Sequence, residues 1–305
     1  MLSKRLPVLM LSLLAGTAAQ AAVLDLTTMM GNANAYTLHN FSAPSSDVEG
    51  ALLSGGSVSI ASYSVNYKDK DAFGSYALVA RNNLTLNGGS IDNGKIYVGG
   101  TTKLTNAAAP PTGAKPVDFD AAASYYKAVS TNLSQAKATG TVTPLWSGVV
   151  LTGKNKGNNP VDVFNVDASV FAHSSSWTLQ NLTPGQTLIF NVGGSSATFN
   201  NGGISFEPLS GYNVLFNFYD ATNVDVRGVI GSVLAPKAAV TTQWGVINGN
   251  VIVDSWSSTI QINANHYFKP INVPTYSSPM SVPEPENYAM LLAGLALVAF
   301  AARRR

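Results

Sequence analysis

The 305-residue sequence predicts a mainly β body, folded as a parallel β-solenoid with one long α-helix, between two terminal targeting segments. Three observations predict this fold. Short apolar runs are punctuated by glycine and asparagine, which is typical of strands and tight corners. Four stretches repeat a strand–turn–strand pattern. One isolated stretch has helical periodicity.

The composition predicts a folded body of low charge. The chain is 46% hydrophobic and 11% charged, against roughly a quarter charged in an average domain. This apolar content can bury a core, so the body is not a disordered polyelectrolyte. So few charges argue against a nucleic-acid partner. The absence of cysteine excludes disulfides and a cysteine nucleophile, and we expect no cofactor and no bound metal.

Residues 1–21 are typical of a secretory signal peptide. Lys4 and Arg5 precede a short apolar core over 6–14. Ala19 and Ala21 form the small-x-small pattern that signal peptidase cleaves, which predicts a mature chain beginning near Ala22. An uncleaved membrane anchor is the alternative, but the apolar run is too short to span a bilayer comfortably.

Residues 22–275 form the predicted β body. Four of its stretches share a glycine, alternating aliphatic residues, a turn and a second aliphatic run: 47–60, 92–105, 225–241 and 245–260. Such units stack most naturally as the coils of a parallel β-solenoid, with inward aliphatics filling the core. A β-sandwich with glycine-rich hairpins is the alternative.

One long helix is expected in the middle of the body. Asp118 and Asp120 suit its N-terminus, and Gly140 is placed to end it. This predicts a helix of about 20 residues. Its apolar stripe consists of Phe119, Ala122, Ala123, Tyr126, Val129, Leu133 and Ala136.

The body resembles the choice-of-anchor A domain of exported bacterial surface proteins. The resemblance is carried by Asn34-Ala35-Tyr36 through Phe41, Ser46 to Gly50 with the Gly55-Gly56 turn, Val214 to Phe218, Gly231 to Pro236, and Ile247 to Asn250. It implies a fold similar to the right-handed ice-binding β-solenoids, with the helix packed alongside. The sequence around His266 lacks the glutamate expected before that histidine, so no role of that glutamate is carried over.

The C-terminus carries a second targeting segment after a proline- and serine-rich linker over 276–282. Pro283, Glu284 and Pro285 precede an apolar stretch of 15 residues over 288–302, about 22 Å long as a helix. The chain ends on Arg303, Arg304 and Arg305. The order of these features resembles the PEP-CTERM sorting signal of Gram-negative bacteria, which implies transient membrane insertion and an exosortase as processing partner. An ordinary membrane anchor is the alternative.

Few residues of the body suggest chemistry. His39, His173 and His266 stand without neighbouring ligands, and the Ser124…Lys127 tetrad lacks its companion motif. We therefore expect no catalytic residues and no enzyme activity. Trp244 and Trp256 are placed in adjoining coils, where they form either a sugar-stacking platform or part of the core.

An ice-binding face needs flat ladders of threonine or serine that recur at the period of the solenoid. The candidate threonines are too scattered along the chain to predict such a face: Thr101, Thr102, Thr105, Thr241 and Thr242.

These observations predict an exported, exosortase-processed surface or matrix protein with a structural or adhesive role in biofilm polysaccharide. A carbohydrate- or ice-binding module is the alternative, and a polysaccharide-cleaving solenoid enzyme is a weaker one. Without residues 1–21 and 283–305, the chain keeps 18 − 5 = 13 basic and 16 − 2 = 14 acidic residues, a net charge of −1. A nearly neutral body suits packing among glycans and not gripping a polyanion by its overall charge.

Overall fold

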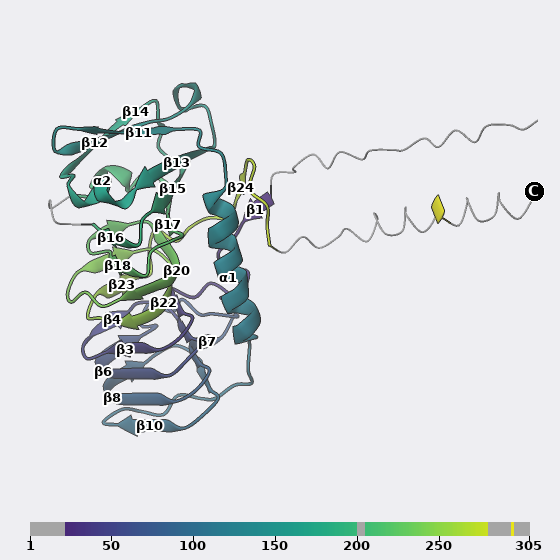
Figure 1. The fold of residues 1–305 in the computed structure, drawn as a ribbon. Helices are drawn as coiled ribbons and strands as arrows, with labels where there is room; N and C mark the ends of the chain where they lie inside the picture. Colours follow the sequence, from purple (N-terminus) through teal and green to yellow (C-terminus); the bar gives the residue numbers. More distant parts are fainter. Residues whose placement is uncertain (1–21, 200–204, 280–293, 296–305) are drawn as a thin grey trace, which may run out of the picture.

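The computed structural model describes residues 22–199, 205–279 and 294–295. In this part of the chain, 19 strands join one sheet that forms three runs of stacked parallel strands (Figure 1). The first run is, in stacking order, β13 (Val161–Asp167), β15 (Thr187–Gly193), β17 (Asn213–Phe218), β20 (Ser232–Val240), β22 (Val251–Ser257), β2 (Ala35–Thr37), β5 (Leu52–Ser54), β7 (Tyr76–Ala80) and β9 (Lys95–Val98).

The other two runs share the long strands with the first run or with each other. The second run is β16 (Ser196–Thr198), β18 (Asn223–Asp225), the later parts of β20 and β22, β3 (Phe41–Ala43), β6 (Val58–Val65), β8 (Leu84–Ile91) and β10 (Thr102–Thr105). The third run is β19 (Val229–Ile230), β21 (Val246–Asn248), β23 (Gln261–Asn263), β4 (Ser46–Val48) and the later parts of β6 and β8.

Smaller elements complete the body. They are the three-stranded sheet of β11 (Thr141–Leu145), β12 (Gly148–Thr152) and β14 (Ser176–Gln180), the antiparallel pair β1 (Ala22–Leu24) and β24 (Ile271–Val273), the helices α1 (Phe119–Ser134) and α2 (Ala168–Ala172), and the 3-10 turns Asn155–Gly157 and Glu207–Leu209.

The prediction of a mainly β body with one long helix is confirmed. The four repeated stretches contribute strands at matching positions of the stack, as in the register of Val233 with Val251. A β-sandwich does not fit, because sandwich sheets are antiparallel and the pairings within these three runs are parallel. The right-handed solenoid stays a prediction, since the strand pairing defines three open runs.

The chain does not climb the stack in sequence order. Its first strands run from β2 down to β10, and α1 then carries the chain back along the stack (Figure 1). The later strands descend from β13 to β22, and β22 pairs with β2. Strands more than 200 residues apart therefore meet in the middle, and we call the contact of β22 with β2 and β3 the seam.

Buried side chains hold the seam together. The Asn34 side-chain amide donates to the carbonyl of Gly249 over 2.9 Å, and the Asn250 amide donates to Ala33 over 3.0 Å. In the next run, the Trp256 ring stacks on Phe41 at a centroid distance of 5.7 Å and an angle of 3°. The buried amides pair backbone groups that would otherwise lose their hydrogen bonds on leaving water.

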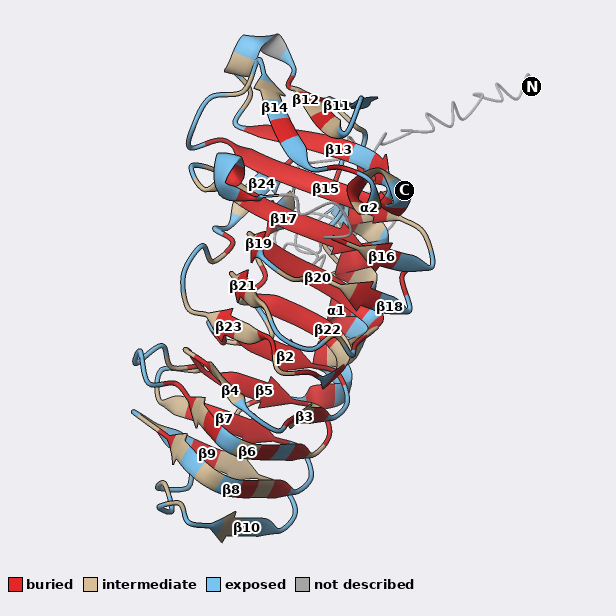
Figure 2. Ribbon diagram, turned by 90° about the vertical axis from the view of Figure 1, so that its left-hand side faces the viewer, coloured by how far each residue is buried: buried red, intermediate tan, exposed pale blue. Residues whose placement is uncertain are grey.

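Two apolar clusters form because strand side chains alternate between faces. Inward residues fill the space between the runs, as Phe164, Phe190 and Phe216 do in a stacked column. Outward residues of the first run instead meet α1, among them Tyr36 and Leu53. Figure 2 shows the mostly buried strands of the stack and, at its lower end, the mostly exposed strand β10 of the second run.

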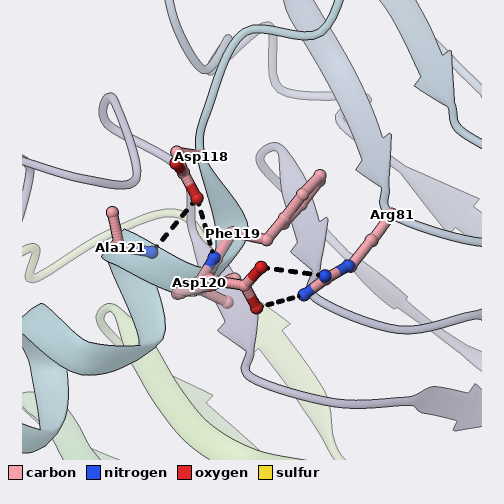
Figure 3. A network of polar contacts seen from close by, with 6 residues as sticks. Arg81, Asp118, Phe119, Asp120 and Ala121 are labelled. Atoms are coloured by element: carbon pink, nitrogen blue, oxygen red, sulfur yellow. Dashed lines mark hydrogen bonds and ion pairs between the residues drawn. The ribbon is translucent and has the colours of Figure 1, made fainter.

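The helix α1 begins as the sequence predicts. Asp118 accepts hydrogen bonds from the backbone N–H groups of Asp120 and Ala121 and caps the first turn (Figure 3). Arg81 holds both carboxylate oxygens of Asp120, at 2.5 and 2.9 Å, and so lowers the pKa of that carboxyl. This exposed pair orients the start of the helix against the coil that contains β7.

The end of α1 differs from the prediction. The helix has 16 residues and ends at Ser134, before Gly140. Gly140 has a different function: its Cα lies so close to the ring of Phe164 that a side chain would clash. The buried face also includes Tyr125 and Ser130, whereas Ala123 is only partly buried.

An asparagine ladder joins α1 to the sheet. Asn165, Asn191 and Asn217 lie at one register position of three adjacent strands, and the amide of Asn217 donates to Asn191 over 2.9 Å. Asn191 donates to the carbonyl of Leu133 near the helix end, and Asn217 exchanges hydrogen bonds with Ser130. The 26-residue spacing of these asparagines is a repeat that the sequence analysis missed.

The body extends slightly past its predicted end. Tyr276, which the sequence places in the linker, is 1% exposed and belongs to the cluster under α1. Asn132 of the helix also donates to the carbonyl of Ser277. The antiparallel pairing of β1 with β24 brings the two ends of the body side by side.

We predict that Asn217→Ala lowers the free energy of unfolding by about 1–3 kcal/mol, because Ser130 and Asn191 lose buried partners. Denaturant unfolding of the variant measures this loss. Asn223→Ala, at an exposed position of β18, is the matched control and should change stability by less than about 0.5 kcal/mol. Equal effects of the two substitutions would show that the ladder does not anchor the helix.

Candidate functional site

A row of hydroxyl groups crosses the outer face of the second run. Ser257, Ser42, Ser59 and Thr85 occupy one register position of β22, β3, β6 and β8. Adjacent strands of a sheet lie about 4.8 Å apart, so the hydroxyls recur at that spacing. Ser59 and Ser257 are exposed and the other two are half-buried. We call these four residues the hydroxyl row.

The core holds the hydroxyl row in line. The neighbouring register position carries Trp256, Phe41, Val58 and Leu84, all turned inward and buried. Because side chains alternate along a strand, this fixes the hydroxyls on the outside. None of the four side-chain hydroxyls is engaged in a hydrogen bond within the described part of the chain.

A shallow concavity of about 420 Å³ lies over the hydroxyl row. Its other lining residues come from the next two register positions of the same strands and from two turns. The first position contributes Ala43 and Ile60, the second contributes Ala61 and Asn87, and the turns contribute Pro44 and Gln243. The surface thus offers hydroxyl and amide groups on a small apolar floor, without a charged side chain among its lining residues. Such a surface can form many weak hydrogen bonds with a hydrated or glycan surface.

Trp244 lies beside this concavity, next in sequence to Gln243. Its side chain is 67% exposed, and its backbone has a left-handed φ of 51°. The Arg227 guanidinium lies 4.5 Å from the ring centroid and is itself held by both carboxylate oxygens of Asp225. The backbone N–H of Trp244 donates to the Thr259 hydroxyl over 2.8 Å. The ring is thereby fixed in place with much of its surface in solvent.

The predicted platform of Trp244 and Trp256 is wrong in its second member. Trp256 is 2% exposed and stacks on Phe41 inside the seam. It faces inward because its register partners Phe41 and Val240 also face the core. Of the two predicted rings, Trp244 alone is exposed; a third tryptophan, Trp146, is 97% exposed.

The histidines and acidic groups are mostly engaged in structural contacts. His39 lies 2.8 Å from Asp254 across the seam, and His173 contacts the Ser169 carbonyl in α2. His266 lies in a loop and has a left-handed φ of 48°. Within the described ranges, no three or more histidine and acidic residues gather to hold a metal ion.

The predicted terminal site residues lie outside the described residues. This applies to Ala19 and Ala21 and to the sorting signal: Pro283, Glu284, Pro285, Arg303, Arg304 and Arg305. Within the part that the structure describes, no helix has the length and apolarity to cross a membrane. The predicted membrane-inserting helix over 288–302 lies outside the described residues, except for 294–295.

Comparisons with known families match two parts of the chain, the β body and the C-terminal sorting segment. Residues 281–305 match the PEP-CTERM protein-sorting motif, and residues 27–264 match the model of an ice-binding-like adhesive domain. Together they identify an exported surface protein whose sorting signal implies processing by an exosortase. Because the second match covers most of the chain, this chain belongs to the ice-binding-like adhesive domain family. No curated protein and no solved structure matches it.

The two matches bear differently on the two resemblances seen in the sequence. The PEP-CTERM resemblance is confirmed. Neither match names the choice-of-anchor A family, so that resemblance stays a prediction.

The hydroxyl row is not recognisable in the sequence because its members are unevenly spaced along the chain. Ser42 and Ser59 are 17 residues apart, Ser59 and Thr85 are 26 apart, and Ser257 comes from the other end of the chain. A search for one fixed period could not align them. The signal present in the sequence is local: each residue lies between two inward apolar residues or next to one.

We predict that Trp256→Ala lowers the free energy of unfolding by about 3–5 kcal/mol, because it empties the stacked position in the seam. Trp146→Ala is the matched control and should cost less than about 0.5 kcal/mol, since that ring is exposed. Chemical denaturation followed by circular dichroism measures both. A Trp256→Ala protein as stable as the control would contradict the placement of this ring in the core.

Proposed function

We propose that this chain is an exported, exosortase-processed adhesive protein of a Gram-negative surface or extracellular matrix, and that the hydroxyl row is its contact surface. The observation that carries the proposal is the alignment of four hydroxyls without intramolecular partners on one rigid face. Membership of the adhesive-domain family and the sorting motif support export and adhesion. The ligand is a neutral polysaccharide of the biofilm matrix.

The three strand runs are, in this proposal, the faces of a right-handed β-solenoid. Long strands such as β6 and β8 take part in two runs each, which supports continuous coils. A solenoid keeps each face flat over many strands, because every coil stacks on the next in register. A flat, stiff face loses little conformational freedom when it binds, so weak contacts add up to useful adhesion.

We also propose that the protein has no catalytic activity. Three carboxylates of the body hold other parts of the fold. Asp254 faces His39, Asp225 holds Arg227, and Asp120 holds Arg81. Both arginines of the body are thus committed to bidentate pairs, and each fixes a turn or a helix end.

Two other functions use the same part of the surface. A carbohydrate-binding module would rely on the fixed, exposed ring of Trp244, on which a sugar can stack. An ice-binding face would rely on the regular spacing of the hydroxyl row itself. Loss of glycan retention in Trp244→Ala alone would favour the first of these. Thermal hysteresis in the purified protein would favour the second.

We predict that the double substitution Ser59→Arg and Thr85→Arg lowers adhesion to purified matrix polysaccharide by roughly tenfold or more, the equivalent of about 1.4 kcal/mol. Two long charged side chains would hold the surface away from its ligand. Binding of the protein to an immobilised polysaccharide layer measures the effect, and thermal unfolding verifies that the variant folds.

The matched control places arginine on a different exposed surface. Ser124→Arg and Thr131→Arg lie on the solvent side of α1 and should leave adhesion unchanged. If the control pair weakened adhesion as much as the first pair, the charge and not the position would be responsible. The hydroxyl row would then lose its role in the proposal.

A separate prediction concerns sorting. Replacing Pro283, Glu284 and Pro285 together with alanine should block removal of the C-terminal segment, so that the uncleaved chain stays with the cells. Mass determination of cell-bound and released protein measures this. Substituting three linker residues, Ser277, Ser278 and Pro279, with alanine is the control and should leave processing intact. Normal processing of the first variant would disprove the role of the sorting motif.

A further inference from the structure

A second cavity lies on another part of the body. It has a volume of about 680 Å³, within the range of roughly 300–1,000 Å³ that is typical of ligand sites. None of its lining residues also lines the concavity at the hydroxyl row. Its walls come from turns that precede β2, β7, β17 and β22 and from the loop over 264–270. We call this cavity the lysine cleft.

Two lysines line the cleft, and both are exposed: Lys70 and Lys269. Neither takes part in any of the ion pairs found among the described residues. Burial, and then the negative charge of Glu49, raise the pKa of the lining residue Tyr267. The Glu49 carboxylate itself has other partners. It accepts hydrogen bonds from the Tyr67 hydroxyl and from the backbone N–H of Ala264.

The backbones of both lysines are held rigidly. The side chain of Asn213 accepts from the backbone N–H of Lys269 over 2.8 Å and donates to its carbonyl over 3.0 Å. The N–H of Lys70 donates to the side chain of Asn66, and its carbonyl accepts from Ala51. The backbone positions of two lysines are thus fixed at the rim of one cavity, in a body whose net charge is close to zero.

The rest of the lining fits a sugar better than a small inorganic ion. Rings of Tyr212, Tyr267 and His266 lie among the lining residues, together with the amides of Asn32 and Asn265. Aromatic rings pack against the apolar faces of sugars, and amides pair with their hydroxyls. Lysine ammonium groups form charge-assisted hydrogen bonds with carboxylates.

We propose that the lysine cleft binds a uronic-acid-containing stretch of polysaccharide, with Lys70 and Lys269 pairing its carboxylates. This site goes beyond the role proposed for the hydroxyl row and does not depend on it. The protein would then have two contacts with the matrix: a neutral face that adheres broadly, and a cleft that selects acidic chains.

The test is calorimetric titration of the processed protein released by its cells, with trigalacturonate and with uncharged galactotriose of the same linkage. We expect binding of the acidic trisaccharide that weakens as salt is added, and at least about tenfold weaker binding of the neutral one. The double substitution Lys70→Ala and Lys269→Ala should weaken trigalacturonate binding by roughly tenfold or more. Arginine at both positions should retain most of the binding.

Lys103→Ala with Lys127→Ala, at exposed positions of β10 and α1, is the matched control and should bind as the unsubstituted protein does. The proposal is overturned if trigalacturonate does not bind, if galactotriose binds equally well, or if the control pair weakens binding as much. Equal binding of a short polyphosphate would also overturn it, because the cleft would then select charge alone. Adhesion through the hydroxyl row is measured separately with neutral polymer and is unaffected by any of these results.

Discussion

The pairing of β22 with β2 is the contact on which the rest of the structure depends. It joins coils from the two ends of the chain into one continuous stack. Without it, each half would expose an apolar strand edge and a cross-section of its core. Buried amides of Asn34 and Asn250 and the stacked rings of Trp256 and Phe41 make this contact specific. Since the partners are so far apart in sequence, this contact closes a longer loop than the pairings between successive strands do, at a cost in chain entropy.

The helix α1 makes this topology possible. It returns the chain along the stack after β10, and its apolar stripe covers outward residues of the first run that would otherwise face water. Arg81 holds its first turn and the asparagine ladder holds its last. The helix therefore spans both halves of the stack and constrains their relative position, so the seam and the helix support each other.

The same register that fills the core also arranges the surface. Each inward ring or aliphatic side chain fixes an outward neighbour, and stacking repeats that neighbour from strand to strand. The hydroxyl row is a direct result of this arrangement, whereas the fixed ring of Trp244 and the lysine cleft are formed by turns and loops between the strands. They share a body of low net charge, so local placement of a few groups, and not the overall field, governs what each surface can bind.

The mainly β class, the start of α1 at Asp118, the repeated strand–turn–strand stretches and the sorting motif follow from the sequence, because they depend on local periodicity, capping and residue order. It missed the end of α1, the burial of Trp256 and the hydroxyl row. Those features depend on which strands become neighbours, and the uneven 17- and 26-residue spacings hide that information from any single period. That Ser257 lies beside Ser42 is visible in the folded protein alone, because the seam brings the two ends of the body together.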